Sequence, residues 1–412
     1  MAINHMTKIK TAIIGGGAAG LFLANALSKN DEKVALFERS ERVGRKLSAT
    51  GNGQGNVTNA AVGNTPYFSA SKRGKSLAER LTSRFDAHSL CDFFNALGVL
   101  IFFDERGRGY PTSRQATALT DALRFSALEN GVSFYVDTAI VDLQKTPSGF
   151  VLTSAKGELF QAETVALCTG GKAAKNFGTD GSAYALATGL GHTLTALRPS
   201  LVQIKTDVSQ TRTLKGIRVF DVGVTAVWTE NGIEKKHTVQ GDIIFTDYGV
   251  SGDAVFRLSA FIADKTQAKL IVDFLPDVTE ETIVRLLENK RAALPKQEDG
   301  ERLCGIVNNQ VGRAIMKTLP CADDETVAKR VKSFVLTVTG SLGFDYAQVT
   351  KGGVAMDEVD DGLQSRKVQD LYFAGEILDV DGECGGFNLQ WAYASARTVA
   401  AAIAEKNKKR QG

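Results

Sequence analysis

Residues 9–20 read Ile-Lys-Thr-Ala-Ile-Ile-Gly-Gly-Gly-Ala-Ala-Gly, and this stretch decides the fold of the first part of the chain. Residues 9–14 form a short apolar run that stops at three glycines, and this pattern predicts a strand. An apolar pattern rich in small residues over 18–29 predicts a helix, and residues 33–38 predict a second strand. The chain therefore opens with a predicted βαβ unit.

The turn between the first strand and the helix fits the pattern GxGxxG of dinucleotide-binding sites. In that pattern the first glycine permits a tight turn, the second lets backbone N–H groups reach a pyrophosphate, and the third lets helix and strand approach each other. Glu38, at the end of the second strand, can accept hydrogen bonds from an adenosine ribose, and its charge favours FAD or NAD over NADP. We therefore predict a dinucleotide site formed by Gly15, Gly17, Ala18, Ala19, Gly20, Glu38 and the adjacent Arg39.

Further elements are predicted in the first part of the chain. Residues 114–130 have the pattern of a helix with Thr112 or Ser113 as its cap, and residues 132–143 and 150–154 have the pattern of two strands joined by a Pro-Ser-Gly turn. These elements extend the predicted sheet.

From about residue 196 the pattern becomes antiparallel. Residues 219–228 and 233–244 predict a hairpin, because the intervening Asn231-Gly232 tolerates the positive φ of such a turn. Helical periodicity follows over 278–335, with Thr279 as the predicted cap. Sheet signals at 370–373 and a helix over 388–404 then return the chain to the first domain. We predict a dinucleotide-binding domain at 1–195 and 341–412, interrupted by an inserted domain at 196–340 that is β-rich over 196–276 and helical over 277–335.

Composition excludes several classes of function. The 412 residues carry a net charge of only +3 without a block of basic and aromatic residues, so we expect no nucleic-acid partner. The chain has no apolar run of membrane-spanning length, and its five scattered cysteines favour a reducing cytoplasm. Its four histidines lack partners at metal-ligand spacing, so we expect no metal site. Ser251 does not stand in a GxSxG sequence, which excludes that hydrolase class; we predict that it caps a helix.

Glycine-rich and polar segments along the chain together form a set of motifs that is specific to one protein family. They are Arg45-Lys46-Leu47, Thr50-Gly51-Asn52-Gly53-Gln54-Gly55-Asn56-Val57-Thr58-Asn59, Thr169-Gly170-Gly171, Thr179-Asp180-Gly181, Leu190-Gly191-His192, Arg198-Pro199-Ser200-Leu201, Phe245-Thr246, Gly249-Val250-Ser251-Gly252, Lys351-Gly352-Gly353-Val354, Tyr372-Phe373-Ala374-Gly375-Glu376, Asp379-Val380-Asp381-Gly382 and Gly385-Gly386-Phe387-Asn388-Leu389-Gln390-Trp391-Ala392. With this set of motifs the sequence resembles the HI0933-like (YhiN/BaiN-like) family of flavoproteins along nearly its whole length. The resemblance implies an α/β fold, with a Rossmann-like FAD-binding domain of the FAD/NAD(P)-binding type and an inserted β-barrel-like and helical domain. It also implies FAD as cofactor and an oxidoreductase activity.

One departure from that family concerns Gln54-Gly55, where family members commonly have Arg-Cys. A function of that Arg or Cys is therefore not expected here. The remaining residues of the loop, Gly51, Asn52 and Gly53, offer backbone N–H groups to a flavin ring or form a flexible loop. Thr169 and Gly170 are added to the cofactor site by the resemblance.

Charged and apolar residues near the ribose strand have two interpretations each. Arg45 and Lys46 either offset the charge of a pyrophosphate or lie solvated on the surface. Val136 either contacts adenine, as the resemblance implies, or fills the core.

The last segment predicts the flavin end of the site. Gly375 and Glu376 follow a strand, where related flavoproteins place an acidic residue against the ribityl chain. Gly386, Phe387, Asn388 and Leu389 lead into a helix, whose N-terminus would stabilise an anionic reduced flavin. The alternative is a packed C-terminal helix behind an acidic turn.

These residues predict an FAD-dependent oxidoreductase that moves a hydride through flavin N5 between a reduced donor and a small organic substrate. There is no second GxGxxG, so NADH or NADPH as the donor would dock transiently. Two alternatives stay open: an oxidase of an amine-type metabolite that uses oxygen, and a non-catalytic redox sensor. The sequence predicts no catalytic residue and no oligomeric state.

Overall fold

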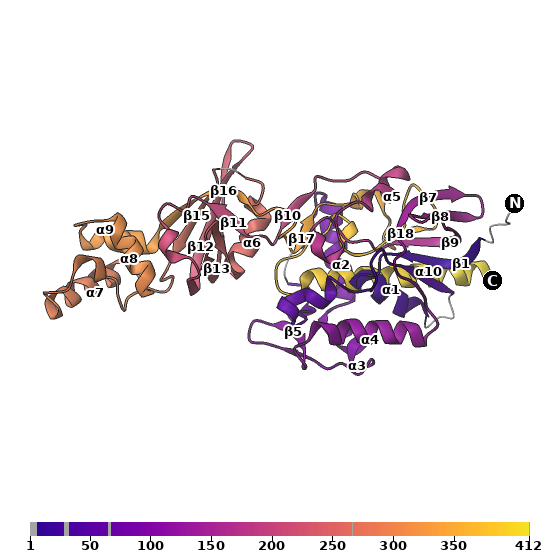
Figure 1. Cartoon of the computed structure of the whole chain (residues 1–412), viewed down its shortest axis with the longest axis horizontal. Coiled ribbons are helices and arrows are strands. Elements are labelled where there is room, and N and C mark those ends of the chain that lie inside the picture. Colours follow the sequence, from indigo (N-terminus) through magenta and orange to yellow (C-terminus); the bar gives the residue numbers. More distant parts are fainter. Residues whose placement is uncertain (1–5, 29–32, 65–66, 266, 412) are drawn as a thin grey trace. The chain divides into compact units, whose positions relative to one another are not determined.

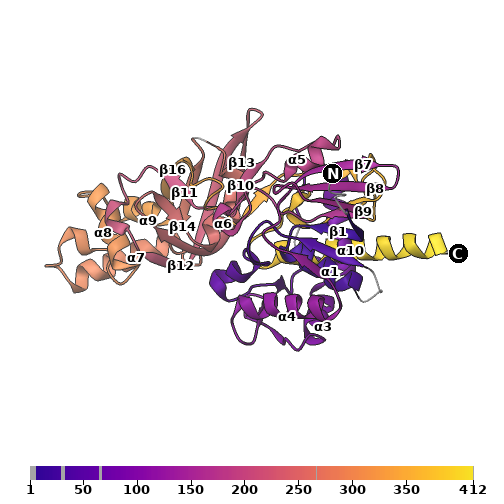
Figure 2. The same cartoon turned by 45° about the vertical axis from the view of Figure 1, so that its right-hand side comes forward.

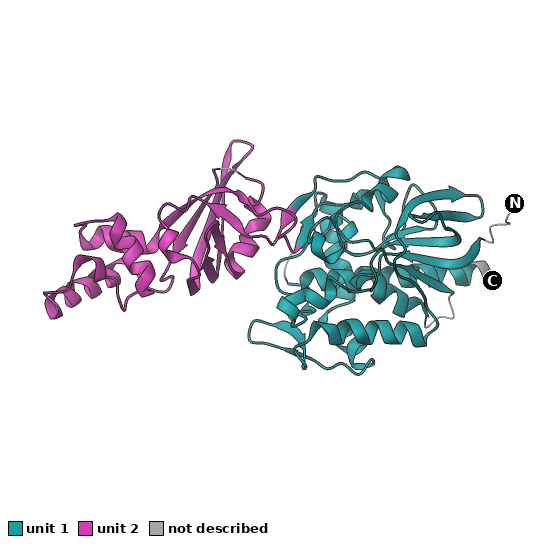
Figure 3. Cartoon of the chain, in the orientation of Figure 1, with its two compact units in different colours: residues 1–198, 349–412 teal, residues 199–348 magenta. Residues whose placement is uncertain are grey.

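The chain divides into two compact units (Figure 3). Unit 1 combines residues 1–198 with 349–412, so both ends of the chain belong to it, and unit 2 comprises Pro199–Gln348. The chain leaves unit 1 through β10 (Arg198–Ser200) and returns through β17 (Val349–Lys351). The structure is a computed structural model that describes residues 6–28, 33–64, 67–265 and 267–411.

A seven-stranded mixed sheet is the frame of unit 1. Its strands are β1 (Thr7–Ile14), β2 (Val34–Phe37), β6 (Ser133–Tyr135), β7 (Ile140–Thr146), β8 (Gly149–Ser154), β9 (Leu159–Leu167) and β18 (Leu371–Phe373). Their order is β6-β2-β1-β9-β8-β7, with β18 also paired to β9. Neighbours among β6, β2, β1, β9 and β18 are parallel, whereas β7 and β8 are antiparallel. The segments that follow the five parallel strands therefore meet at one edge, where ligands of such sheets bind.

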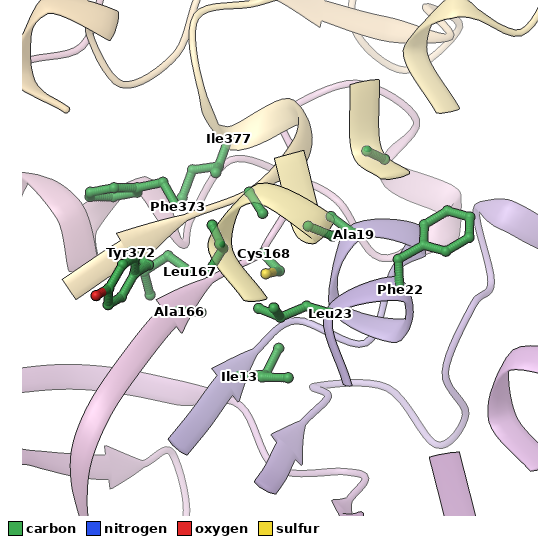
Figure 4. Close-up of a cluster of buried hydrophobic side chains, with 14 of the residues drawn as sticks. Ile13, Ala19, Phe22, Leu23, Ala166, Leu167, Cys168, Tyr372, Phe373 and Ile377 are labelled. Carbon is green, nitrogen blue, oxygen red and sulfur yellow. The ribbon is translucent and has the colours of Figure 1, made fainter. Parts of the chain in front are cut away.

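Helices cover this sheet, and α1 and α10 lie side by side (Figure 1 and Figure 2). Among the buried hydrophobic side chains of the core, Figure 4 shows Ile13 of β1, Leu23 of α1, Leu167 of β9 and Phe373 of β18. The first and last segments of the chain thus share one core. The helices of unit 1 are α1 (Ala18–Ser28), α2 (Lys72–Arg84), α3 (Ala87–Asn95), α4 (Ala116–Glu129), α5 (Tyr184–Gly189) and α10 (Phe387–Gln411), and a small sheet contains β3 (Thr58–Asn59), β5 (Arg108–Pro111) and β4 (Ile101–Phe103).

Unit 2 is built on a closed barrel with the strand order β11-β14-β13-β12-β15-β16. The long hairpin of β12 and β13 turns at Asn231 and Gly232, both with positive φ, as predicted. Thr279 caps α7 by accepting the N–H of Thr282. The elements are β11 (Ile204–Thr206), β12 (Arg218–Glu230), β13 (Ile233–Phe245), β14 (Gly249–Ser251), α6 (Asp253–Ile262), β15 (Lys269–Asp273), α7 (Glu280–Ala293), α8 (Asn309–Thr318), α9 (Asp324–Lys332) and β16 (Phe334–Ser341).

Several predicted element ends were wrong for local reasons. Helix α4 begins after Gln115, not at residue 114, because Arg114 has a left-handed φ of 51°. The strand predicted over 132–143 is two strands, β6 and β7, with Asp137 at a φ of 49° between them. Ser251 belongs to β14 and does not cap α6, which starts behind a glycine. The predicted fold class itself, a Rossmann-like domain with a barrel, is confirmed.

Candidate cofactor site

The glycines of the first turn have very different surroundings. A Cβ atom at Gly15 would lie 2.4 Å from the carbonyl oxygen of Cys168, and one at Gly20 would lie 1.9 Å from that of Gly15. These two glycines are required because β1, β9 and α1 approach closely. At Gly17, in contrast, an added Cβ would have no heavy atom within 4 Å. The turn therefore leaves open space at the start of α1.

Glu38 is held by the backbone beside that space. Its Oε2 accepts the N–H of Gly16 at 2.9 Å, and its Oε1 accepts the N–H of Ser40 at 2.8 Å. Ala18 and Ala19 begin α1, and the first N–H groups of a helix lack partners within it and carry partial positive charge. These residues fit a dinucleotide: the open space and the helix N-terminus would hold its pyrophosphate, and the Glu38 carboxylate would accept hydrogen bonds from its ribose.

The segments after β9 and β18 approach the same turn. A Cβ at Gly15 would lie 2.9 Å from the Cα atom of Thr169, whose Oγ1 is buried without a hydrogen-bond partner among the described residues. A Cβ at Gly375 would lie 2.7 Å from the Cβ atom of Ala19. Gly170 adjoins Thr169 and is half-buried. The structure thus brings predicted site residues from both ends of the chain to α1.

Arg39 and Arg45 both bind the segment that follows β9. Nη1 of Arg39 donates to Oδ1 of Asp180 at 2.8 Å, and Nη2 of Arg45 donates to the carbonyl oxygen of Asn176 at 3.0 Å. Partial burial opposes ionisation of Asp180, but hydrogen bonds from Ser182 and Arg39 outweigh it and lower the pKa of Asp180 to about 2. A carboxylate therefore neutralises Arg39. Arg45 pairs with no carboxylate among the described residues, so its charge is available to a phosphate.

An ion pair joins two predicted site residues that lie 330 positions apart. Nζ of Lys46 donates to Oε2 of Glu376 at 2.7 Å, and both side chains are largely buried. The second oxygen of Glu376 accepts the N–H of Thr350 at 2.8 Å, and the Thr350 hydroxyl accepts N–H groups of Lys172 and Ala173. Thr350 is not among the residues predicted from the sequence. Its only signal was its place directly before a glycine-rich segment that carries part of the family resemblance.

A buried hydroxyl lies beside the acidic residues of the last segment. The hydroxyl of Tyr184 has no hydrogen-bond partner in the described part of the chain. Burial, followed by the charges of Glu376 and Asp379, raises the pKa of Tyr184, so the phenol stays protonated. Burial also raises the pKa of Asp379, whose Oδ2 accepts the N–H of Ala70 at 2.9 Å. Tyr184 could not be predicted from the sequence, because one tyrosine in a short helix forms no motif.

The glycine-rich loop forms an irregular turn that begins in the short helix η1 (Leu47–Gly53). Gly51 and Asn52 have φ values of 58° and 55°, and residues 51–54 are exposed. A Cβ at Gly53 would have no heavy atom within 4 Å, whereas one at Gly51 would lie 2.9 Å from the backbone nitrogen of Asn56. The backbone of this loop is therefore accessible to a planar ligand.

The predicted residues of the C-terminal turn begin α10. The side chain of Asn388 closes the turn, because its Oδ1 accepts the N–H of Gly382 at 2.9 Å and its Nδ2 donates to the Gly382 carbonyl at 2.9 Å. Phe387 is buried, and its carbonyl accepts the hydroxyl of Tyr67 at 3.0 Å. Leu389 is half-buried. The side chains of Phe387 and Asn388 thus stabilise the turn, which leaves the backbone at the start of α10 as the part that could meet a flavin.

Val136 follows β6, and 40% of its surface is exposed. It lines a cavity of about 490 Å³ together with Phe134 and residues of α4. The interpretation of Val136 as a core residue is therefore wrong. Its contact with adenine stays a prediction.

His192, outside the predicted site, is in a buried polar network. Its Nδ1 lies 3.0 Å from Oε2 of Glu358, and its Nε2 lies 2.8 Å from Oγ of Ser365. The order resembles a Ser-His-Glu triad, but this serine oxygen is buried and already accepts the N–H groups of Lys367 and Val368. The network is therefore structural. Among the described residues no His, Cys, Asp and Glu side chains group to hold a metal, and no helix has the length and apolar character to cross a membrane.

Comparison with protein families gives a match to the HI0933-like protein Rossmann domain over residues 9–402. A 3-dehydro-bile acid delta(4,6)-reductase of Clostridium scindens is 34% identical, over 96% of this chain and 99% of its own length. A ribosomal RNA dihydrouridine synthase of Escherichia coli is 28% identical, over 95% of this chain and 97% of its own length.

Solved structures with the same fold share little sequence with this chain. A 3-ketosteroid-delta4-(5alpha)-dehydrogenase from Rhodococcus jostii has a TM-score of 0.50 at 15% identity and covers 97% of this chain and 98% of its own. A flavocytochrome c3 fumarate reductase has a TM-score of 0.51 at 14% identity, over 97% of this chain and 78% of its own. At this identity the likeness concerns the fold alone.

Proposed function

Because this chain belongs to the HI0933-like family and is an FAD-dependent oxidoreductase, we propose that it reduces a carbon–carbon double bond conjugated with a carbonyl group in a small organic substrate. The observation that carries this proposal is the relative of 34% identity that aligns over 96% of the chain, since its name describes reduction of ring double bonds in a 3-oxo bile acid. The product named for the Escherichia coli relative, dihydrouridine, is likewise a ring with a reduced double bond. The names of both relatives therefore describe the same class of reaction, the reduction of a ring double bond.

The residues of the candidate site divide the task of holding FAD. The open turn at Gly17 and the start of α1 would bind the pyrophosphate, and Glu38 would bind the adenosine ribose. Lys46 and Glu376, fixed by their ion pair, would orient the middle of the cofactor. Bound FAD supplies the hydride chemistry, and the protein supplies orientation, exclusion of water and local charge.

We propose NADH or NADPH as the electron donor. The single GxGxxG of the chain is assigned to FAD, so the nicotinamide cofactor would bind transiently at the flavin and leave before the organic substrate enters. An exchange of this kind needs an accessible flavin face, and the exposed backbone of residues 51–54 would supply one wall of such a face.

The test is the visible spectrum of the purified protein under anaerobic conditions. We expect NADH or NADPH to bleach the absorbance of oxidised flavin, and a conjugated enone added next to restore it. A flavin that stays oxidised with both nicotinamides but is reduced by an amine would contradict the proposal in favour of an oxidase. A flavin that neither nicotinamides nor amines reduce would instead indicate a redox sensor.

A second candidate substrate is uridine in ribosomal RNA, favoured by the names of two relatives at 28% and 27% identity. The same spectroscopic assay distinguishes it from the first candidate. Reoxidation of the reduced flavin by ribosomal RNA, and not by a small enone, would favour this alternative.

A further inference from the structure

Arg114 stands at the glycine-rich loop in an unusual conformation. It lies between β5 and α4 with a φ of 51°, which is costly for a residue with a long side chain. Its N–H donates to the carbonyl of Pro111 at 2.9 Å, so a tight turn fixes the backbone. A conformation of this kind persists where the surrounding structure holds it, and such residues are often found at ligand sites.

The guanidinium group of Arg114 is held by aromatic rings and by the loop. Its Cζ lies 4.4 Å from the ring centroid of Phe102 and 4.4 Å from that of Tyr110. Nη1 donates to Oε1 of Gln54 at 3.0 Å. Stacking and one hydrogen bond orient the planar group and leave further N–H donors for another acceptor.

The charge of Arg114 is not neutralised by the described residues, since no described carboxylate pairs with it. The nearby Arg108 differs, because its Nε and Nη2 bind Oδ2 of Asp104 at 2.8 and 2.7 Å. The cluster around the loop therefore keeps one free positive charge. A guanidinium with free N–H donors can bind the two oxygens of a carboxylate through parallel hydrogen bonds.

Apolar side chains accompany this charge. Leu100, directly before β4, is 59% exposed, and Phe102, two residues further on and therefore on the same face of the strand, has the guanidinium over its ring. An exposed apolar strand beside one cation suits an amphipathic ligand with an apolar body and one acidic group.

From this geometry we propose that Arg114 binds the carboxylate of the organic substrate, and that the substrate class is a carboxylic acid with an apolar ring system. The inference rests on the proposed function, because it places the reacting substrate beside the loop of residues 51–55. Arg114 acts as a specificity-determining residue: it selects and positions the acid and takes no part in hydride transfer.

The experiment titrates the FAD-containing protein with 3-oxo-chol-4-enoic acid and with its methyl ester, which lacks the charge. Binding is followed by the change in the flavin spectrum and by calorimetry, which reads binding without the flavin. We expect the acid to bind about tenfold more tightly than the ester. Arg114→Gln should remove this preference by weakening the acid alone, with flavin content unchanged.

Two further variants separate recognition from structure. In the double variant Arg114→Gln with Gln54→Arg, a guanidinium returns from the neighbouring position, because these two side chains lie 3.0 Å apart, and we expect the acid preference to recover. Arg84→Gln is the matched control, since Arg84 is also an exposed arginine over an aromatic ring, that of Phe85, and its loss should leave the preference intact.

The outcomes of this experiment distinguish the two proposals. A wild-type protein that binds acid and ester equally, or binds neither, overturns the role of Arg114, as does an Arg114→Gln variant that keeps the preference. A protein whose flavin is not reduced by nicotinamide, yet which prefers the acid by calorimetry, would contradict the proposed function and leave the acid-binding site standing.

Discussion

Two glycine-containing turns in unit 1 lead into helices, and they differ in what surrounds the glycine. At the turn before α1, a Cβ added at Gly17 would meet no heavy atom within 4 Å. At the turn before α10, a Cβ added at Gly386 would lie 2.3 Å from the carbonyl oxygen of Thr58. The first glycine borders open space, whereas the second is in contact with the backbone of β3.

This difference separates two reasons for a glycine that the sequence presents alike. Gly17 is not needed by the packing of the protein itself, so a ligand is the best reason for its small size. Gly386, with a φ of 103°, is needed by the fold before any ligand is present. A substitution at Gly386 should therefore lower mainly the stability of the protein, whereas a substitution at Gly17 should lower mainly its affinity for the cofactor.

The largest expected effect is a loss of stability in Gly386→Ala. The new Cβ would clash with Thr58, and the backbone would be strained at this positive φ, so we expect the free energy of unfolding to fall by roughly 2–5 kcal/mol. Denaturant unfolding followed by circular dichroism measures this loss. Gly385→Ala is the control, because Gly385 also has a positive φ, of 118°, but its nearest contact is Nδ2 of Asn59 at 3.3 Å and not a backbone atom, so the loss of stability should be smaller. Equal stability of the Gly386→Ala variant and the wild type would break the comparison.

Gly17→Val should lower the affinity for FAD and not the stability of the protein. A side chain fits beside Gly17 in the protein but occupies the proposed pyrophosphate position, so we expect FAD affinity to fall about 100-fold or more while the stability of the apoprotein changes little. Titration of each apoprotein with FAD measures the affinity, and denaturant unfolding of the variant and wild-type apoproteins measures the stability. A variant that purifies with full flavin would disprove the proposed site. Gly17→Ala, with one carbon, should lose less affinity.

Sequence alone predicted those features that depend on short stretches of chain. The βαβ unit and the hairpin around Asn231 and Gly232 follow from residue types close together in the sequence, and the structure has both. The start of α4 could not be predicted in this way. Arg114 adopts its left-handed φ because the Pro111 turn and the Phe102 and Tyr110 rings hold it, and these are contacts of the folded chain.

The contacts that assemble the site were also beyond local patterns. Lys46 and Glu376 were each predicted near the cofactor, but not their ion pair, because nothing in the local sequence relates two residues 330 positions apart. Likewise, the glycine pattern does not tell whether Gly17 or Gly386 faces a ligand. That distinction depends on the position of Thr58, on another element.

Lys46→Met tests the ion pair that joins the segment after β2 to the segment after β18. Removing the ammonium group leaves Glu376 without its ion-pair partner and removes a positive charge from the proposed pyrophosphate region. We expect FAD affinity to fall about tenfold, with a smaller loss of stability than for Gly386→Ala. Reconstitution with FAD measures the change, and Lys46→Arg should retain most of the affinity because it keeps the charge. Unchanged affinity in Lys46→Met would show that the protein holds the cofactor without this pair.

The smallest expected effect is on the pH dependence of stability. It comes from His192, a residue outside both turns, so it should change stability without changing cofactor binding. Burial lowers the pKa of His192 below its usual value of 6.5, so the folded protein favours the neutral ring. The stability from this preference is present above about pH 6.5 and is lost as the pH falls below it, because the unfolded chain then binds the proton more readily. The facing carboxylate, Glu358, stays ionised over this range, since hydrogen bonds from Lys367 and Thr193 outweigh partial burial and lower its pKa to about 2.

We therefore expect the wild-type melting temperature to fall between about pH 7.5 and about pH 5.5, and His192→Gln to reduce this fall. Thermal unfolding of both proteins at the two pH values measures the difference. FAD content of the variant at the higher pH should match the wild type, because His192 contacts Glu358 and Ser365 and neither turn. If His192→Gln loses as much flavin as Gly17→Val does, flavin loss is a consequence of lower protein stability. Loss of flavin in Gly17→Val would then be no evidence that the cofactor occupies the open space at Gly17.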